Sequence, residues 1–325
     1  MKLSKQFNPL FFQASLAAGG VALMPFNFLQ FAVPHGKGLI QFSMINWGNL
    51  NMINAVLYSI LIGIMFIAVI IHVILTVVFL KGLFEWSMNR QATSEFINDP
   101  YKNATIFPII GSLAMSANVV WAAVGFFVPQ VADRMQAIML PSLLYFVMLW
   151  SVLFTLEWKV VRVWFGKSVK TDKFNFVWLL DVFAFGLVSL TGSGVAAMST
   201  NTLIAALAVA GTVLTIIIGL FIFVAKLTLL ITSLIKAKKL PDNPILPAFF
   251  LVVPISCLFG LSLFRLTAYF QTFLKIDMSG ASFVVMNLSY AIAVLWVAIT
   301  LYLLFFYFKN YFLKSNYSAP QWGIV

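Results

Sequence analysis

Apolar and polar positions form long alternating blocks along the chain, and eight of the apolar blocks are long enough to cross a lipid bilayer. A spanning helix needs about 20 predominantly apolar residues. The blocks lie approximately at residues 9–31, 54–84, 104–128, 136–165, 175–198, 202–235, 245–272 and 281–312. Charged residues are nearly confined to the gaps, and no gap is long enough for a separate soluble domain. The pattern predicts an all-α integral membrane protein with residues 1–325 as a single transmembrane domain.

The first block is predicted to be a membrane helix and not a cleavable signal. Lys2 and Lys5 precede an apolar stretch that is longer than the apolar region of a signal peptide.

The odd-numbered blocks differ from the even-numbered ones because they are shorter and contain more glycine and proline. Such residues free backbone groups, which a membrane helix tolerates only against protein or a water-filled cavity. We therefore predict that the odd helices surround a central pore and that the even helices face lipid. The candidate pore-lining or kink residues are Gly19, Gly20, Pro25, Gly111, Gly192, Gly194, Pro254 and Gly260. Among these, Gly19, Gly111, Gly192 and Gly260 are expected to face the central axis.

Each odd block opens with a similar cluster of aromatic residues, proline or asparagine. The clusters lie at residues 7–12, 106–108, 174–178 and 243–250, and a fifth lies at 317–325. The later clusters recur at intervals of about seventy residues, which predicts a repeated helical hairpin and a pseudo-fivefold arrangement. Four hairpins are then complete, and a ninth helix is cut at its start. The alternative is that proline and aromatic residues gather at membrane interfaces without any repeat.

Lysine and arginine are distributed asymmetrically between the two sides of the predicted membrane. Fifteen of the twenty lie at the chain ends or near the gaps that follow even blocks, whereas the gaps after odd blocks hold only Lys37, Arg134 and Lys275. Because cytoplasmic loops are rich in lysine and arginine, the N-terminus is expected in the cytoplasm of a multi-pass inner-membrane protein. The net charge of +11 has the same explanation, so no nucleic-acid partner is predicted.

The composition excludes a soluble enzyme. Only 9% of the residues are charged, 62% are hydrophobic, and the mean hydropathy is +1.01, whereas soluble domains carry about 25% charged residues. One cysteine and two histidines exclude a disulfide scaffold and leave almost nothing for haem or zinc ligation. No catalytic set and no phosphate-binding glycine motif is found. We predict a protein that is not an enzyme and that has no cofactor and no metal.

Three charged residues inside the blocks are candidates for function, because charges at membrane depth are costly. Asp181 and Lys226 share a hairpin, and two interpretations stay open for them. Either they pair in its cytoplasmic half, or Lys226 reaches the interface and Asp181 caps or pairs locally. Arg265 either attracts anions at the external mouth or anchors to lipid headgroups.

Two further polar residues are expected to be structural. Glu157 precedes Lys159 by two positions near a cytoplasmic end, and a local ion pair between them is predicted. His72 lies in a smoothly apolar block and is expected to have a structural role.

Phenylalanine is frequent, with 34 residues, and several lie in the odd blocks. A pore lined by apolar groups suits large monovalent anions, which lose their hydration shell at low cost, and helix ends at kinks offer N–H groups to an anion. Most of these phenylalanines are expected to fill the core or face lipid.

The whole pattern resembles the tellurite-resistance/dicarboxylate transporter family, which includes the slow anion channel of plant guard cells. The resembling stretches are 11–20, 95–100 with 107–108, 154–157, 244–250 and 317–322. The resemblance implies ten helices, a central pore between five inner helices, trimeric assembly, and passage of small anions across the lipid membrane. It also implies a phenylalanine plug on the ninth helix, which cannot be assigned to any residue of this sequence.

The end of the chain leaves two interpretations open. The cluster at 317–325 begins a helix that does not continue, which suggests either a truncated product or a UGA codon for selenocysteine, as in the selenium-associated TsoY-type relatives. We expect the coding frame to continue past Val325. The leading function is a channel or carrier for small anions, with a selenium- or tellurium-oxyanion link as a narrower hypothesis. The alternatives are a membrane-integral selenol or thiol redox protein with its reactive residue beyond Val325, and a membrane scaffold without transport.

Overall fold

The computed structural model describes residues 7–36, 38–170, 173–314 and 319–324, and within these residues it contains helices and no β-strand. Eight of the described helices are long and apolar enough to cross a membrane, which confirms the eight predicted spans. The predictions that involve Lys2, Lys5, Lys37 and residues 317–318 fall outside the described residues.

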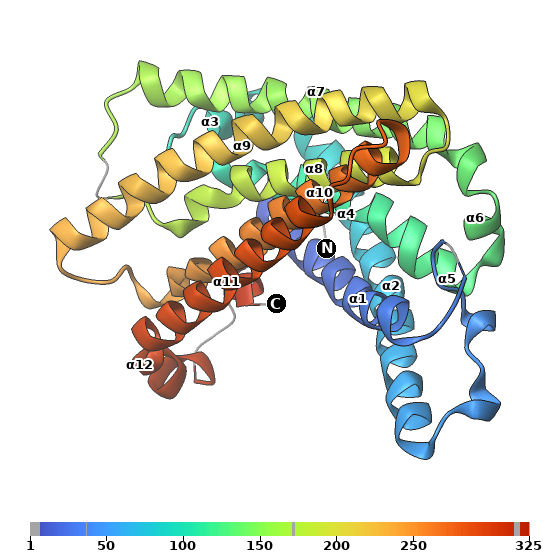
Figure 1. Ribbon diagram of the computed structural model, residues 1–325. Coiled ribbons are helices and arrows are strands. Elements are labelled where there is room, and N and C mark those ends of the chain that lie inside the picture. Colours follow the sequence, from blue (N-terminus) through green and yellow to red (C-terminus); the bar gives the residue numbers. More distant parts are fainter. Residues whose placement is uncertain (1–6, 37, 171–172, 315–318, 325) are drawn as a thin grey trace.

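The eight spans are built from long helices, which Figure 1 shows packed against one another. Their main helices are α1 (Phe12–Ala32), α2 (Met52–Ser87), α4 (Pro108–Val119), α7 (Met135–Gly166), α8 (Leu180–Met198), α9 (Thr202–Ala237), α10 (Val252–Phe273) and α11 (Ser279–Leu303). The third span continues from α4 through a π-helical segment, η6 (Val120–Val124), into α5 (Gly125–Phe127). The short helices are α3 (Arg90–Ile97), α6 (Pro129–Asp133) and α12 (Phe305–Tyr307).

The aromatic and proline clusters at the openings of the odd spans form 3-10 helical segments. These are η2 (Pro9–Phe11), η5 (Asn103–Ile106), η8 (Phe176–Leu179), η9 (Asn243–Leu251) and η11 (Ala319–Ile324). Side chains that cap the backbone begin two of them: Asn8 accepts a hydrogen bond from Leu10 N at 3.0 Å, and Asn175 accepts one from Val177 N at 3.0 Å. Each segment contacts the next one in chain order, and η11 also contacts α1. The pseudo-fivefold symmetry itself stays a prediction.

The odd spans are buried inside the molecule and the even spans cover them, as the glycine and proline content predicted. In the most apolar stretch of each span, the buried share is 50%, 67%, 89% and 56% for the odd spans and 22%, 33%, 28% and 11% for the even ones. Helix α1 packs against α4, α4 against α8, and α8 against α10. The helices of the even-numbered spans cover these inner helices: α2 packs on α1, α9 on α8, and α11 on α10. Helix α7, which also belongs to an even-numbered span, packs on both α8 and α9.

Two features differ from the sequence prediction. The last span was predicted to be continuous over 281–312, but α11 ends at Leu303 and is followed by α12 and a π-helical segment, Phe308–Phe312. The gap at 85–103, for which the sequence predicted no helix, contains α3, which begins where the side chain of Asn89 accepts a hydrogen bond from Ala92 N at 3.1 Å.

Candidate functional site

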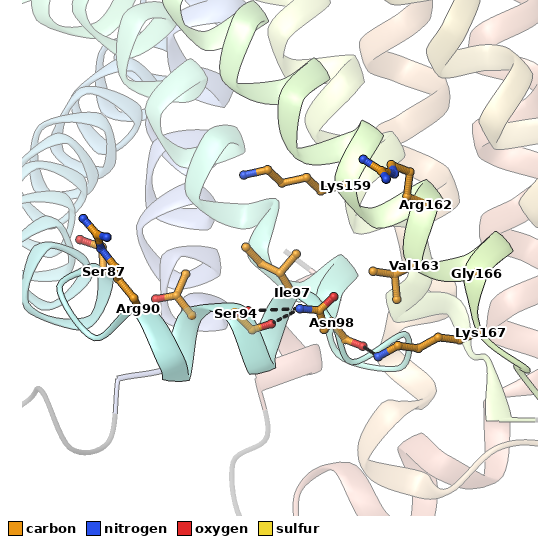
Figure 2. A pocket seen from close by; sticks show the side chains of 11 residues that line it. Ser87, Arg90, Ser94, Ile97, Asn98, Lys159, Arg162, Val163, Gly166 and Lys167 are labelled. Carbon is orange, nitrogen blue, oxygen red and sulfur yellow. Dashed lines mark hydrogen bonds between the residues drawn. The ribbon is translucent and has the colours of Figure 1, made fainter.

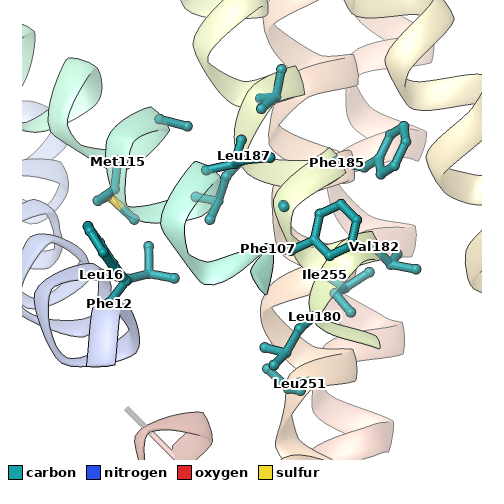
Figure 3. Close-up of a cluster of buried hydrophobic side chains, with 14 of the residues drawn as sticks. Phe12, Leu16, Phe107, Met115, Leu180, Val182, Phe185, Leu187, Leu251 and Ile255 are labelled. Carbon is teal, nitrogen blue, oxygen red and sulfur yellow. The ribbon is translucent and has the colours of Figure 1, made fainter. Parts of the chain in front are cut away.

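A small apolar cavity lies between the four inner helices. Its volume is about 150 Å³. The lining residues are Gln13, Leu16, Ala17, Gly20, Met115, Phe183, Leu187, Leu251, Pro254, Leu258 and Trp322. Figure 3 shows Leu16 and Met115 facing Leu187 in the surrounding apolar cluster. Gln13 brings the one carboxamide of this lining, and its buried Oε1 atom has no hydrogen-bond partner within the described residues.

The face of α10 that lines this cavity leads to Arg265. Leu251 and Leu258 line the cavity, and Arg265 follows Leu258 at the same interval of seven residues, which is close to two turns of a helix. The cavity face of α8 continues in the same direction, because Leu190 lies three residues beyond Leu187 and its carbonyl group accepts a hydrogen bond from Arg265. The Arg265 guanidinium therefore lies between α8 and α10, about two helical turns from Leu258 of the apolar cavity.

The Arg265 guanidinium contacts neutral oxygen atoms. Its Nη1 atom donates to Leu190 O at 3.2 Å and to Asn118 Oδ1 at 3.4 Å. Neither of the two ion pairs found among the described residues includes Arg265. A cationic group that has no carboxylate partner at membrane depth is costly unless water, a cavity or an anion compensates it. These hydrogen bonds hold the Arg265 guanidinium between inner helices, and both interpretations of its role stay predictions.

Asn118 is held in the orientation that presents its oxygen to Arg265. Its Nδ2 atom donates to Ala114 O at 3.0 Å and to Thr191 Oγ1 at 3.2 Å, so Oδ1 is directed to the guanidinium. Asn118 was not among the predicted site residues, because an isolated asparagine in an apolar span carries no spacing signal.

Gly194 leaves space for the Arg265 side chain. A Cβ atom at this position would lie 2.9 Å from a ring carbon of Trp121 and 3.3 Å from Arg265 Nη1. Trp121 belongs to the π-helical segment η6, and its Nε1 atom donates to Ser142 Oγ at 3.2 Å. Such π-helical turns are frequent at functional sites.

Gly20 and Pro254 line the central cavity, and Gly111 lies directly behind it. A Cβ atom at Gly111 would lie 3.0 Å from Leu187 and 3.4 Å from Leu16, which are both lining residues. Pro25 is buried inside α1.

Three glycines that were expected on the central axis lie at contacts with outer helices. Gly19 faces His72 of α2 as well as Met115, Gly192 faces Phe146 of α7 and Thr212 of α9, and Gly260 faces Ser289 of α11. Their physical role is close helix packing, which small residues permit in membranes. The glycine content identified the inner helices but not the face on which each glycine lies.

Asp181 and Lys226 form a buried ion pair, which is one of the two interpretations that the sequence left open. Lys226 is 3% exposed and Asp181 is fully buried. The Lys226 Nζ atom also donates to Trp178 O at 2.9 Å and lies 4.0 Å from the ring centroid of Trp164. The ammonium group therefore remains inside the protein, which excludes the alternative in which it reaches the interface.

Glu157 joins this pair, and the predicted ion pair with Lys159 is wrong. Glu157 is 5% exposed and lies beside Asp181 and Lys226, whereas Lys159 is exposed. Residues two positions apart on a helix point in different directions, so sequence proximity was misleading here. Neither carboxylate oxygen of Glu157 accepts a hydrogen bond from the described residues. No group of three potential metal-ligating side chains occurs in the described part of the chain.

His72 connects three helices through a buried polar network. Its Nδ1 atom donates to Ser15 O at 2.7 Å, and its Nε2 atom lies 2.9 Å from Ser116 Oγ. Ser112 Oγ donates to Ser15 Oγ at 3.0 Å. The network joins α2 to α1 and α4, and it accounts for the buried histidine in structural terms.

Comparison with known protein families gives one match over almost the whole chain. The profile of the SLAC1 family, described as a voltage-dependent anion channel, matches residues 6–325. No curated protein and no solved structure matches the chain with significant similarity.

Proposed function

Because the chain belongs to the SLAC1 family of voltage-dependent anion channels, we propose that it conducts small monovalent anions along the path between α1, α4, α8 and α10. The observation that carries the proposal is Arg265, a cation on the cavity face of α10 that contacts only neutral oxygens among the described residues. A fixed positive charge in a low-dielectric cleft concentrates anions and repels cations.

The two parts of the path have different roles in this proposal. Arg265, positioned by Asn118 and by the carbonyl of Leu190, attracts an anion and replaces part of its hydration shell. The apolar cavity then lets an anion pass without binding it so strongly that it cannot leave, since conduction requires weak binding. The Gln13 carboxamide offers N–H donors inside this lining.

The test is ion selectivity in planar bilayers that contain the purified protein. Under a potassium chloride gradient, we expect the wild-type reversal potential to lie near the chloride equilibrium potential. Removing hydrogen bonds to a charged group costs about 1.5–3 kcal/mol, so Arg265→Gln should lower the anion-to-cation permeability ratio about tenfold or more. Arg134→Gln is the matched control, because Arg134 is an exposed arginine in the connection before α7. Cation selectivity in the wild type, or unchanged selectivity in Arg265→Gln, would contradict the proposal.

The same bilayer measurement also tests the narrower hypothesis that the protein transports selenium or tellurium oxyanions. Replacing chloride by selenite or tellurite on one side should preserve an anion current if these ions are transported. A current with chloride but none with either oxyanion would reject this hypothesis and leave the anion channel proposal intact.

We further propose that the protein resides in the inner membrane with a cytoplasmic N-terminus and assembles as a homotrimer. The lysine and arginine asymmetry supports the orientation, and the trimer rests on the family resemblance. The mass of the detergent-purified complex, measured by light scattering, tests the trimer, and a monomeric mass would reject it.

A further inference from the structure

A second, strongly basic cavity lies between α3 and the ends of α2 and α7, away from the residues of the conduction path. Its volume is about 590 Å³. The lining residues are Ser87, Arg90, Thr93, Ser94, Ile97, Asn98, Lys159, Arg162, Val163, Gly166 and Lys167. Four of them are cationic, none is acidic, and Ser87, Thr93 and Ser94 add hydroxyl groups. In Figure 2, Arg90 lies on one side of this space, and Lys159, Arg162 and Lys167 lie along α7 on the other.

The cavity walls are held together by specific contacts. The Trp86 and Phe96 rings lie 5.6 Å apart and fix α3 to the end of α2. The Lys167 ammonium group donates to the backbone carbonyl of Asn98, which joins the end of α7 to the segment after α3. These two residues are 69 positions apart in the chain. The general excess of cytoplasmic lysine and arginine explains why cations occur here, but it does not explain their convergence with hydroxyl groups around one cavity.

Glu95 of α3 and Asp99, which follows α3, are engaged in other interactions. Gln91 Nε2 donates to Glu95 Oε1 at 2.9 Å, and Asp99 pairs with Lys102 at 3.4 Å. Neither Glu95 nor Asp99 lines the cavity. The cations in the cavity are therefore not neutralised by these carboxylates.

The chemistry of the lining matches a phosphate group. Guanidinium groups bind phosphate oxygens through two parallel hydrogen bonds, and lysine ammonium groups and hydroxyls add further donors. The cavity volume lies within the usual range of ligand sites, about 300–1,000 Å³. Basic pockets between transmembrane helices on the cytoplasmic side are typical sites for anionic headgroups.

We propose that this cavity binds a phosphate group, supplied either by the headgroup of an anionic phospholipid or by a soluble phosphate compound. The site is formed by the outer helices α2 and α7 together with α3, so its occupant does not enter the conduction path. It would stabilise the contact between α3 and α7, which the Lys167–Asn98 hydrogen bond makes in the protein alone.

The first test measures the thermal unfolding midpoint of the detergent-purified full chain with two probes. The probes are a short-chain phosphatidylglycerol and inorganic pyrophosphate. We expect at least one probe to raise the unfolding midpoint of the wild type. The double variant Arg90→Gln/Arg162→Gln should weaken the apparent affinity for this probe about tenfold or more, because each lost charged hydrogen bond costs about 1.5–3 kcal/mol. Lys236→Gln/Lys309→Gln is the matched control, because it removes two exposed charges outside the cavity.

The second test stays informative if the double variant folds poorly. In a Cys257→Ala background, which removes the one native cysteine, Lys159→Cys should be protected from maleimide by the binding probe, and Lys236→Cys should not. Protection by phosphatidylglycerol alone identifies a lipid site, and protection by pyrophosphate alone identifies a soluble ligand. The proposal would be overturned if neither probe raised the unfolding midpoint. It would also be overturned if Arg90→Gln/Arg162→Gln and Lys236→Gln/Lys309→Gln lost the same amount of apparent affinity.

Discussion

Arg265 and Asn118 meet between α10 and α4, with Nη1 of the arginine 3.4 Å from Oδ1 of the asparagine. The asparagine cannot turn away without losing its bonds to Ala114 O and Thr191 Oγ1. Two helices from distant parts of the chain thus hold one cation in a defined position. Preorganised polar groups of this kind cost little reorganisation when an ion binds.

The first prediction concerns Asn118 as a positioning residue. Asn118→Leu removes the carboxamide acceptor and both donor bonds, so the guanidinium should lose its fixed position. We expect a lower anion-to-cation permeability ratio than in the wild type, but a smaller loss than in Arg265→Gln, because the charge is still present. Asn287→Leu on the exposed face of α11 is the control. Reversal potentials measure both variants, and equal values for Asn118→Leu and the wild type would show that Asn118 does not position the charge.

The second prediction concerns the width of the apolar cavity. Leu258 lines it, whereas Leu263 on the same helix does not. Leu258→Ala removes most of a side chain from the lining, so single-channel conductance should increase. Both leucines are partly buried, which makes Leu263→Ala a control for the general loss of packing. If the two variants had the same conductance, the cavity would not limit ion passage.

The third prediction concerns the buried charge cluster. Lys226 is the one cation that lies beside both Asp181 and Glu157 in the described structure. Lys226→Met leaves the two carboxyl groups without it, and breaking a buried pair in this way costs about 3–5 kcal/mol. We therefore expect a markedly lower thermal unfolding midpoint in detergent.

Glu157→Gln, in contrast, should raise the thermal unfolding midpoint or leave it unchanged. The carboxyl group of Glu157 has no hydrogen-bond donor among the described residues and lies beside a second carboxylate. A neutral amide keeps the side-chain volume and cannot place a second negative charge beside Asp181. A large loss of stability in Glu157→Gln would show that Glu157 contributes an attractive interaction to the cluster.

Much of the fold could be predicted because the membrane restricts which backbone structures can cross it. Backbone groups in lipid must be satisfied within a helix, so block length alone located the eight spans. Glycine and proline content separated buried from covering helices, because only buried helices tolerate them at this density. Asp181 and Lys226 stood out as candidates because few charges occur at membrane depth, but the sequence left open whether they pair.

The site could be predicted only in part, because side-chain direction depends on packing. The sequence identified Arg265 as a candidate but not its partner Asn118, which lies on a different helix. It identified Gly192 and Gly260 but not the outer helices that they face. The basic cavity was missed because Arg90 and Arg162 lie far apart in the chain and line the same cavity only when α3 folds against α7.

The fourth prediction tests the orientation in the membrane. In a Cys257→Ala background, cysteines at Lys170 and Lys238 should be protected from a membrane-impermeant maleimide in intact cells, because both follow even spans. Asp277→Cys, in the exposed connection between α10 and α11, should be labelled. Labelling of Lys170→Cys or Lys238→Cys from outside the cell would contradict the proposed orientation and support the opposite one.

The last prediction concerns the contact between inner and outer helices around Phe146. The Phe146 ring lies between Gly192 and Gly211. A Cβ atom added at Gly192 would lie 2.6 Å from the nearest ring carbon, and one added at Gly211 would lie 2.9 Å from the nearest ring carbon. Gly192→Leu must separate α8 from α7 and α9, and overpacking of this kind costs about 1–3 kcal/mol or more. Gly63→Leu is the control, since a Cβ atom at Gly63 meets nothing within 4 Å, and the change improves helix propensity by as much as about 1 kcal/mol.

Thermal unfolding of the purified variants measures both effects, and the double variant Gly192→Leu/Phe146→Ala identifies their cause. Phe146→Ala alone should be destabilising because the ring is almost fully buried. If the leucine occupies the space of the removed ring, the double variant should be less destabilised than the sum of the two single changes. Additive losses would mean that Gly192 does not pack against Phe146, and equal tolerance of Gly192→Leu and Gly63→Leu would mean that close packing at α8 does not limit the fold.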